Sequence, residues 1–265
     1  MVNLVQADLY KLRKTKSIKI LFAITTVCAA VMTMLAYLIP QGKIEDSMAQ
    51  IGFMFSDVNV ISILGAVVAG IFICGDFDNK IIHNAIANGS GRGAVIVSKT
   101  AVFCFAIALI LLPYAVITGI ARGSGSEFGM GSMSIGFLNL LTSESGTALS
   151  TAEVWKLLAV MLTLLIVYMA QLSICVPLAL MLKKPVFVIA IYYAFTIACG
   201  QLTGLKESYP TFYRIFSFTP YGGDYSFMNL HTESEDLLQA VGVSLAFIIV
   251  MLAIAYSTFR KSEIK

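Results

Sequence analysis

Long apolar runs alternate with short polar segments along the chain. Six runs without Asp, Glu, Lys or Arg meet or approach the roughly 20 residues that a helix needs to cross a hydrocarbon core about 30 Å thick. They cover residues 20–39, 58–75, 100–121, 157–182, 186–203 and 237–259. The fourth run contains Pro177, which predicts a kink. The pattern therefore predicts an all-α integral membrane protein with six transmembrane helices.

Composition strengthens this interpretation. Hydrophobic residues make up 58% of the 265 residues and charged residues 12%, whereas a soluble domain is typically about 25% charged. These values exclude a disordered chain, a nucleic-acid-binding domain and a secreted disulfide scaffold. The five cysteines lie in apolar runs without Cys-x-x-Cys spacing, which favours buried free thiols: Cys28, Cys74, Cys104, Cys175 and Cys199.

The distribution of basic residues predicts the orientation. If the N-terminus is cytoplasmic, thirteen of the 18 Lys and Arg residues lie on the inner side of the membrane, as the positive-inside rule requires. Shifting the frame by one helix reverses the bias. We therefore expect a multi-pass protein with cytoplasmic N- and C-termini.

Catalytic motifs are missing from the sequence. It has no Gly-x-x-x-x-Gly-Lys-Ser/Thr, no His-Glu-x-x-His and no Gly-x-Ser-x-Gly. The segment 89–94 fits a loose dinucleotide fingerprint but lacks the preceding strand that the motif needs. We therefore predict no catalytic residue and no metal site. Because the six runs contain no charged residue, an ion-coupled carrier is disfavoured.

Residues 1–19 predict an amphipathic elbow helix before the first span. Leu4, Val5, Leu9 and Leu12 share one helical face, and Lys11, Arg13 and Lys14 lie on the other. Asp8 interrupts the apolar side, three residues before Lys11 and within pairing reach. Such a helix is typical of the inner membrane interface, where it contacts anionic lipid and borders a partner. The alternative is a simple topology signal.

Residues 76–99 form a second amphipathic segment, between the second and third spans. Phe77, Ile81, Ile82, Ala85 and Ile86 fall on one face of a predicted helix of about 12 residues, roughly 18 Å long. Asn88-Gly89 provides a helix stop. The periodicity alone leaves two alternatives, a helix that docks in a partner's groove and one that lies on lipid.

A family resemblance favours docking. The stretch Asp76-Phe77-Asp78-Asn79-Lys80, followed by Gly89, Arg92 and Lys99, resembles the first cytoplasmic loop of type-2 ABC transporter permeases. The stretch Ala7-Asp8-Leu9-Tyr10-Lys11-Leu12-Arg13-Lys14 resembles the N-terminal elbow of the same family. In this chain Asp76 stands where the family usually has Glu, Ile81 where Thr is common, and Gly91 where Ser or Thr is common.

The resemblance implies a plasma-membrane permease of a bacterial ABC exporter. It implies a second permease, identical or related, and a separate ATP-binding subunit that holds ATP and Mg²⁺; this chain itself would bind no cofactor. Residues 76–99 would be the coupling loop, and the residues that couple it to the ATPase would be Asp76, Phe77, Ile81, Ile82, Asn84, Ile86, Gly89, Arg92 and Lys99. Of these, Phe77, Ile81, Ile82 and Ile86 would bury into the partner or against the elbow. Residues 204–236 would form re-entrant helices that close the outer exit. The small permeases of similar pattern export antimicrobial peptides or confer immunity to them.

Uncharged polar residues inside the spans are candidates for a substrate path: Tyr168, Gln171, Ser173, Tyr192, Tyr193, Thr196 and Gln201. Hydrogen bonds between helices are the alternative role for each of them. A path without charges suggests an amphipathic or lipid-like substrate. Two other functions stay open: a stand-alone secondary carrier or channel, and a membrane scaffold that transports nothing.

Overall fold

The computed structural model of the protein describes residues 2–130, 134–143, 145–146, 149–203 and 209–261. Within these ranges the chain is helical and contains no strand. Six helices are long and apolar enough to cross a membrane, which confirms the predicted number: Lys16–Leu38, Ala49–Asp78, Arg92–Gly123, Thr151–Leu182, Pro185–Leu202 and Ser234–Arg260. The chain therefore has the pattern of a multi-pass membrane protein.

The helices extend further than the apolar runs. α1 (Val2–Lys14) precedes α2 (Lys16–Leu38). The second long helix begins with α3 (Ala49–Met54) and continues through α4 (Asp57–Ala69), the π-helical turn η2 (Gly70–Cys74) and α5 (Gly75–Asp78). α6 (Ile81–Ala87) leads into α7 (Arg92–Gly123). Short helical turns are η1 (Asp46–Met48) and η3 (Asp224–Ser226).

The second half of the chain starts with α8 (Phe137–Thr142), followed by α9 (Thr151–Leu172) and α10 (Cys175–Leu182). The break between α9 and α10 lies beside the proline for which a kink is predicted: Pro177 has no N–H to donate to the carbonyl of Ser173, which accepts from Val176 instead. α11 (Pro185–Thr203), α12 (Pro210–Phe216) and α13 (Ser234–Lys261) complete the fold.

α7 lies at the centre of the bundle, packed against α1, α2, α4, α8, α9 and α13. Of its most apolar stretch, 61% is buried, compared with 17% for α11 and 11% for α13. The two peripheral helices therefore present apolar side chains outward, as expected where lipid is the solvent.

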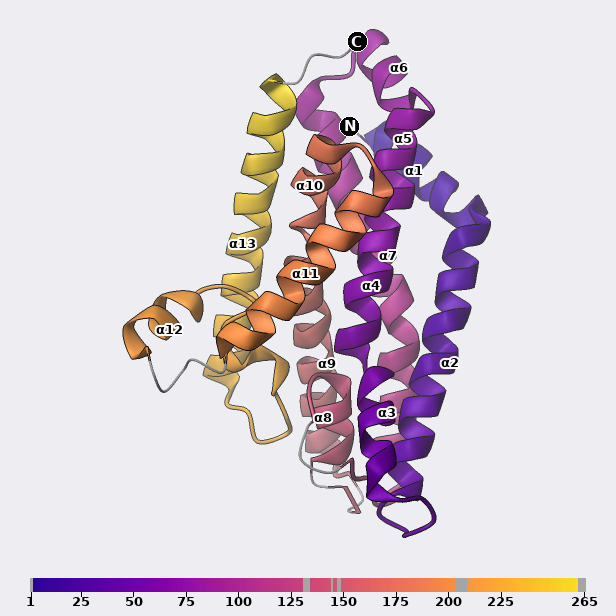
Figure 1. Cartoon of the computed structure of the whole chain (residues 1–265), viewed down its shortest axis with the longest axis vertical. Coiled ribbons are helices and arrows are strands. Elements are labelled where there is room, and N and C mark those ends of the chain that lie inside the picture. The colour runs from indigo at the N-terminus through magenta and orange to yellow at the C-terminus, as the bar shows by residue number, and fades with distance from the viewer. Residues whose placement is uncertain (1, 131–133, 144, 147–148, 204–208, 262–265) are drawn as a thin grey trace.

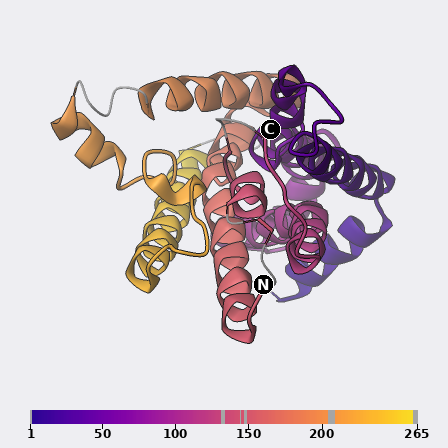
Figure 2. The ribbon, with the colours of Figure 1, turned by 90° about the horizontal axis from the view of Figure 1, so that it is seen from below.

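Figure 1 shows where the chain ends and short helices lie along the bundle. The start of α1 and the end of α13 lie at one end, together with α5, α6 and the turn between α10 and α11. This is called the termini end below. α3 and α8 lie at the opposite end. α12 has no buried residue and projects sideways from the bundle in both views (Figures 1 and 2). It does not plug the interior of this chain.

Candidate functional site

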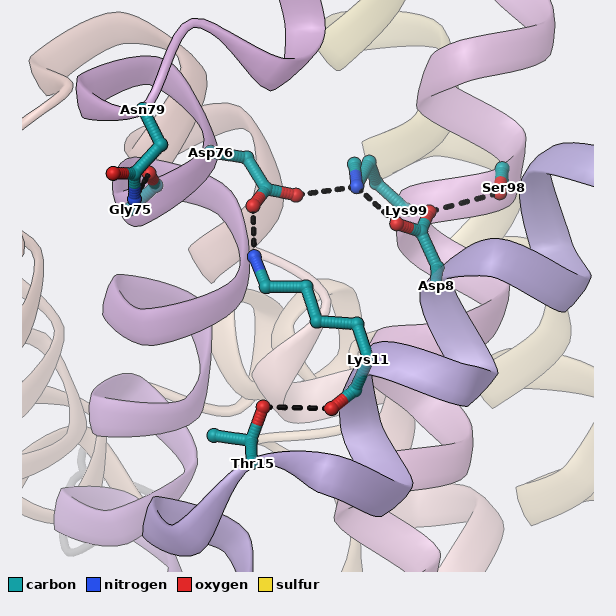
Figure 3. A network of polar contacts seen from close by, with 8 residues as sticks. All are labelled: Asp8, Lys11, Thr15, Gly75, Asp76, Asn79, Ser98 and Lys99. Carbon is teal, nitrogen blue, oxygen red and sulfur yellow. Dashed lines mark hydrogen bonds and ion pairs between the residues drawn. The ribbon is translucent and has the colours of Figure 1, made fainter.

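A buried charge cluster joins three helices at the termini end, as Figure 3 shows. Asp76 of α5 is fully buried and accepts from the ammonium groups of both Lys11 and Lys99, the latter at 2.5 Å. Lys99 of α7 also donates to Asp8 of α1 at 2.5 Å, and Asp8 accepts from the Ser98 hydroxyl at 3.1 Å. Two carboxylates and two ammonium groups thus balance one another, with Asp76 and Lys99 buried and the Lys11 side chain 32% exposed.

The cluster depends on how α1 packs. Asp8 and Leu12 lie one helical turn apart and are both buried, because this side of α1 faces α7. The predicted pairing of Asp8 with Lys11 is wrong: Asp8 pairs with Lys99, and Lys11 reaches Asp76. Arg13 lies on the exposed side. The acidic residue on the apolar face of α1 therefore connects this helix to α7, beside the buried Leu12 and the Lys11–Asp76 ion pair.

Segment 76–99 differs from the single helix that its periodicity predicts. Lys80 adopts a left-handed conformation (φ 56°), which ends α5 and separates it from the short α6. The prediction of a single helix of about 12 residues is therefore wrong. A left-handed residue breaks the i to i−4 ladder, so the two pieces point in different directions.

The apolar residues assigned to docking divide into two groups. Phe77 and Ile82 are buried inside this chain, with 8% and 1% of their surface exposed. Ile86 is half-buried, whereas Ile81 is 40% exposed and Asn84 is exposed. A partner could therefore reach Ile81 and Asn84 directly, but not Ile82.

Phe77 connects α5 to the other side of the bundle. Its ring makes edge contacts with Phe259 of α13 and with His83, and the Lys183 ammonium lies 5.3 Å from its centroid. Arg92, at the start of α7, donates to the carbonyls of Phe259 and Arg260 at 3.0 and 2.9 Å, at the last turn of α13. These contacts tie α5, α7, the α10–α11 turn and α13 together at the termini end.

Gly89 ends α6 as predicted. The N–H of Gly89 donates to the Ile86 carbonyl and that of Ser90 to the Ala85 carbonyl, both at 3.0 Å, which is the Schellman pattern. Gly89 has φ 86°, a conformation that costs an L-residue roughly 1–2 kcal/mol. Nothing lies within 4 Å of a Cβ placed on it, so only the backbone resists substitution.

We expect Gly89→Ala to loosen α6 locally. The strain should raise amide hydrogen exchange at Ser90 about 5- to 30-fold, because 1.4 kcal/mol corresponds to tenfold. Gly91→Ala is the matched control, since Gly91 has φ −63° and an equally open surrounding. Equal protection of Ser90 in the two variants would contradict a strain-bearing role for Gly89.

A second polar cluster, which no sequence pattern predicted, lies in the opposite half of the molecule. Asp57, the first residue of α4, is fully buried; its Oδ2 accepts from the Tyr168 hydroxyl and, at 3.1 Å, from the N–H of Phe137. Its Oδ1 has no hydrogen-bond partner among the described residues. Asp57 immediately precedes the apolar run of residues 58–75. The helix starts one residue earlier than that run and places the Asp57 carboxyl inside the bundle.

The proposed substrate-path residues take different positions. The Tyr168 hydroxyl donates to Asp57. The side-chain amide of Gln171 donates to the Pro220 carbonyl at 2.8 Å, and the main-chain carbonyl of Gln171 accepts from the Tyr221 hydroxyl. Tyr192 is buried at 2% exposure, whereas Tyr193 and Gln201 are exposed. Tyr168 and Gln171 thus have the structural hydrogen bonds that were the alternative role. The structure does not bring the seven candidate residues together along one surface, because Tyr168, Ser173 and Tyr192 are buried whereas Tyr193 and Gln201 are exposed.

The described residues contain no group of three or more His, Cys, Asp or Glu that could hold a metal ion. All five cysteines are free thiols. The chain matches no protein-family model and no curated protein sequence. Only the residues and their geometry therefore bear on the function of this chain.

Proposed function

We propose that this chain is the membrane-spanning permease subunit of an ATP-binding cassette exporter in a bacterial plasma membrane. In this proposal both termini are cytoplasmic, α1 is the elbow helix, and a separate subunit binds ATP and Mg²⁺. A second permease, a copy or a paralogue, completes the pathway. The substrate is an amphipathic molecule, such as an antimicrobial peptide or a lipid-like compound.

The observation that carries the proposal is the position of Asp76. The exposed helix α6 follows directly on α5, and Asp76 of α5 is held by Lys11 of α1 and Lys99 of α7. A force applied to α6 by a nucleotide-binding partner would therefore reach the central helix and α1 through these ion pairs as well as through the buried side chain of Ile82. Buried ion pairs are sensitive to geometry, which suits them to transmit such a movement.

The exposed face of α6 defines the docking test. Changing Ile81 to Asp should reduce the recovery of a P-loop ATPase with the solubilised full-length protein at least about tenfold, because burying one large aliphatic side chain contributes about 1.5–3 kcal/mol. Folding should be preserved, since Ile81 is 40% exposed. Co-purification from native membranes, quantified by mass spectrometry, measures the effect.

Gln50→Asp is the matched control, because it adds the same charge to an exposed helical position at the opposite end. A photo-cross-linking residue placed at position 81 and then at position 50 gives an independent readout. Adducts at position 81 should contain a protein with a Walker motif. Unchanged ATPase recovery from Ile81→Asp, or adducts at 81 with phospholipid alone, would refute the docking role.

A second candidate, a secondary carrier, is favoured by one observation. Asp57 is a fully buried carboxyl with one oxygen lacking a hydrogen bond in the described structure, and buried acidic groups in membrane proteins often carry protons or ions. Proteoliposomes that contain this chain alone distinguish the two candidates. Substrate movement driven by an ion gradient without ATP would support the carrier and overturn the permease proposal.

A further inference from the structure

A cavity beside α12 has no role in the proposed function. It measures about 330 Å³ and lies between α12, η3 and the first turns of α13. This volume falls within the roughly 300–1,000 Å³ of small-molecule sites. Its lining combines aromatic rings, a thioether and carboxylates: Tyr213, Tyr225, Phe227, Met228, Asp224 and Asp236.

The aromatic part of the lining is held in place by hydrogen bonds. Tyr225 is buried, and its hydroxyl donates to the Ser217 carbonyl at 2.8 Å. Burial raises the pKa of Tyr225, so this hydroxyl stays protonated and remains able to donate its hydrogen bond. Tyr213 donates to Asp224 at 3.4 Å. The ring of Tyr225 is therefore part of a fixed wall, and Tyr213 ties the α12 side of the cavity to η3.

The charges of the lining have one sign. The described residues that line the cavity include Asp224 and Asp236 but no Lys, Arg or His. The electron-rich faces of Tyr and Phe attract cations that lie within about 6 Å of the ring centroid. Carboxylates beside aromatic faces therefore select a positively charged group with an apolar body, and they repel anions.

We propose that this cavity binds the ammonium group of an organic cation, either free or as part of a lipid headgroup. Aromatic rings and the Met228 thioether would surround the apolar carbons, while Asp236 would neutralise the charge. Binding in this cavity is independent of the proposed transport function, because it needs neither an ATPase nor a second permease.

The Asp236 carboxylate also has a second role, at the start of a helix, which a neighbouring residue allows us to separate from ligand binding. It lies in the first turn of α13 with Glu235, where any acidic residue interacts favourably with the helix dipole. Glu235 shares that position but does not line the cavity. The pair Asp236→Asn and Glu235→Gln therefore separates a helix-terminus effect from a contact with a ligand.

The probe is choline, and the control ligand is 3,3-dimethylbutan-1-ol, which has the same shape without the charge. Saturation-transfer NMR measures binding to the full-length chain in phosphatidylglycerol nanodiscs, with empty nanodiscs as background. We expect choline to bind and the neutral isostere not to bind. Asp236→Asn and Tyr213→Leu should each weaken choline binding about 5- to 30-fold, and Glu235→Gln should leave it unchanged.

Repeating the measurement in phosphatidylcholine nanodiscs identifies the source of the cation. Loss of choline binding there would mean that the lipid headgroup occupies the site, and retained binding would mean that a free molecule does. The proposal is overturned if choline does not bind above background, if the neutral isostere binds equally well, or if Asp236→Asn and Glu235→Gln have the same effect.

Discussion

Changing Asp76 to Asn should destabilise the folded protein by about 3 kcal/mol. Removing one partner of a buried ion pair typically costs about 3–5 kcal/mol, because the remaining charge is left without compensation. We expect the lower bound, since Lys99 keeps its contact with Asp8 and the Lys11 side chain is 32% exposed and can reach water. Thermal or denaturant unfolding of the full chain in detergent, followed by helical circular dichroism, measures the change.

Two further variants test whether this loss comes from the cluster. Asp78→Asn removes an exposed carboxylate from the same short helix and should change stability by less than about 0.5 kcal/mol. Asp76→Asn with Lys11→Gln leaves the Asp8–Lys99 pair intact and restores neutrality. The double variant should be more stable than the sum of the two single changes predicts. Additive losses would mean that Asp76 and Lys11 do not act as a pair.

The six long helices could be predicted because a bilayer imposes a length and an apolar composition on every span. Their ends could not be predicted in the same way. α7 begins at Arg92, whereas its apolar run begins at residue 100. Lys99 can lie buried on this helix because Asp8 and Asp76 neutralise its charge, and both carboxylates come from other elements. A charge that ends an apolar run in sequence need not end the helix.

Part of the candidate site could also be predicted from the sequence. Asp8, Asp76 and Lys99 stood out as charges at the margins of apolar segments, but their pairing depends on how α1, α5 and α7 pack. The helical period of segment 76–99 placed Ile81 and Ile82 together on one face, yet one is exposed and the other buried. The left-handed Lys80 changes the direction of the chain, and no local pattern signals a left-handed Lys.

The Asp57 cluster lay beyond prediction because its partners are distant in sequence. Tyr168 belongs to α9, and the Phe137 N–H begins α8 after a glycine-rich segment. Gly136 directly precedes Phe137. It has φ 65° and ψ −133°, and its N–H donates to the Ser226 carbonyl at 2.6 Å. The glycine thus joins three separate parts of the chain at one point.

Gly136→Ala should strongly destabilise the folded protein. A Cβ at this position would lie 2.1 Å from the Tyr168 hydroxyl oxygen and 2.2 Å from Oδ2 of Asp57. Backbone strain of about 1–3 kcal/mol and overpacking of about 1–3 kcal/mol add up, so we expect a loss of about 2–6 kcal/mol in unfolding free energy. Thermal unfolding and limited proteolysis at residues 124–150 should both reveal it.

Gly42→Ala separates the two causes of that loss. Gly42 has φ 66°, nearly the same as Gly136, but nothing lies within 4 Å of a Cβ placed on it. It should lose only the backbone part, about 1–3 kcal/mol. If the two variants unfold alike, the collision with Tyr168 and Asp57 contributes nothing. If only Gly136→Ala exposes α8 to protease, the buried carboxyl is what holds that helix to the bundle, because the Phe137 N–H is its hydrogen-bonded link to Asp57.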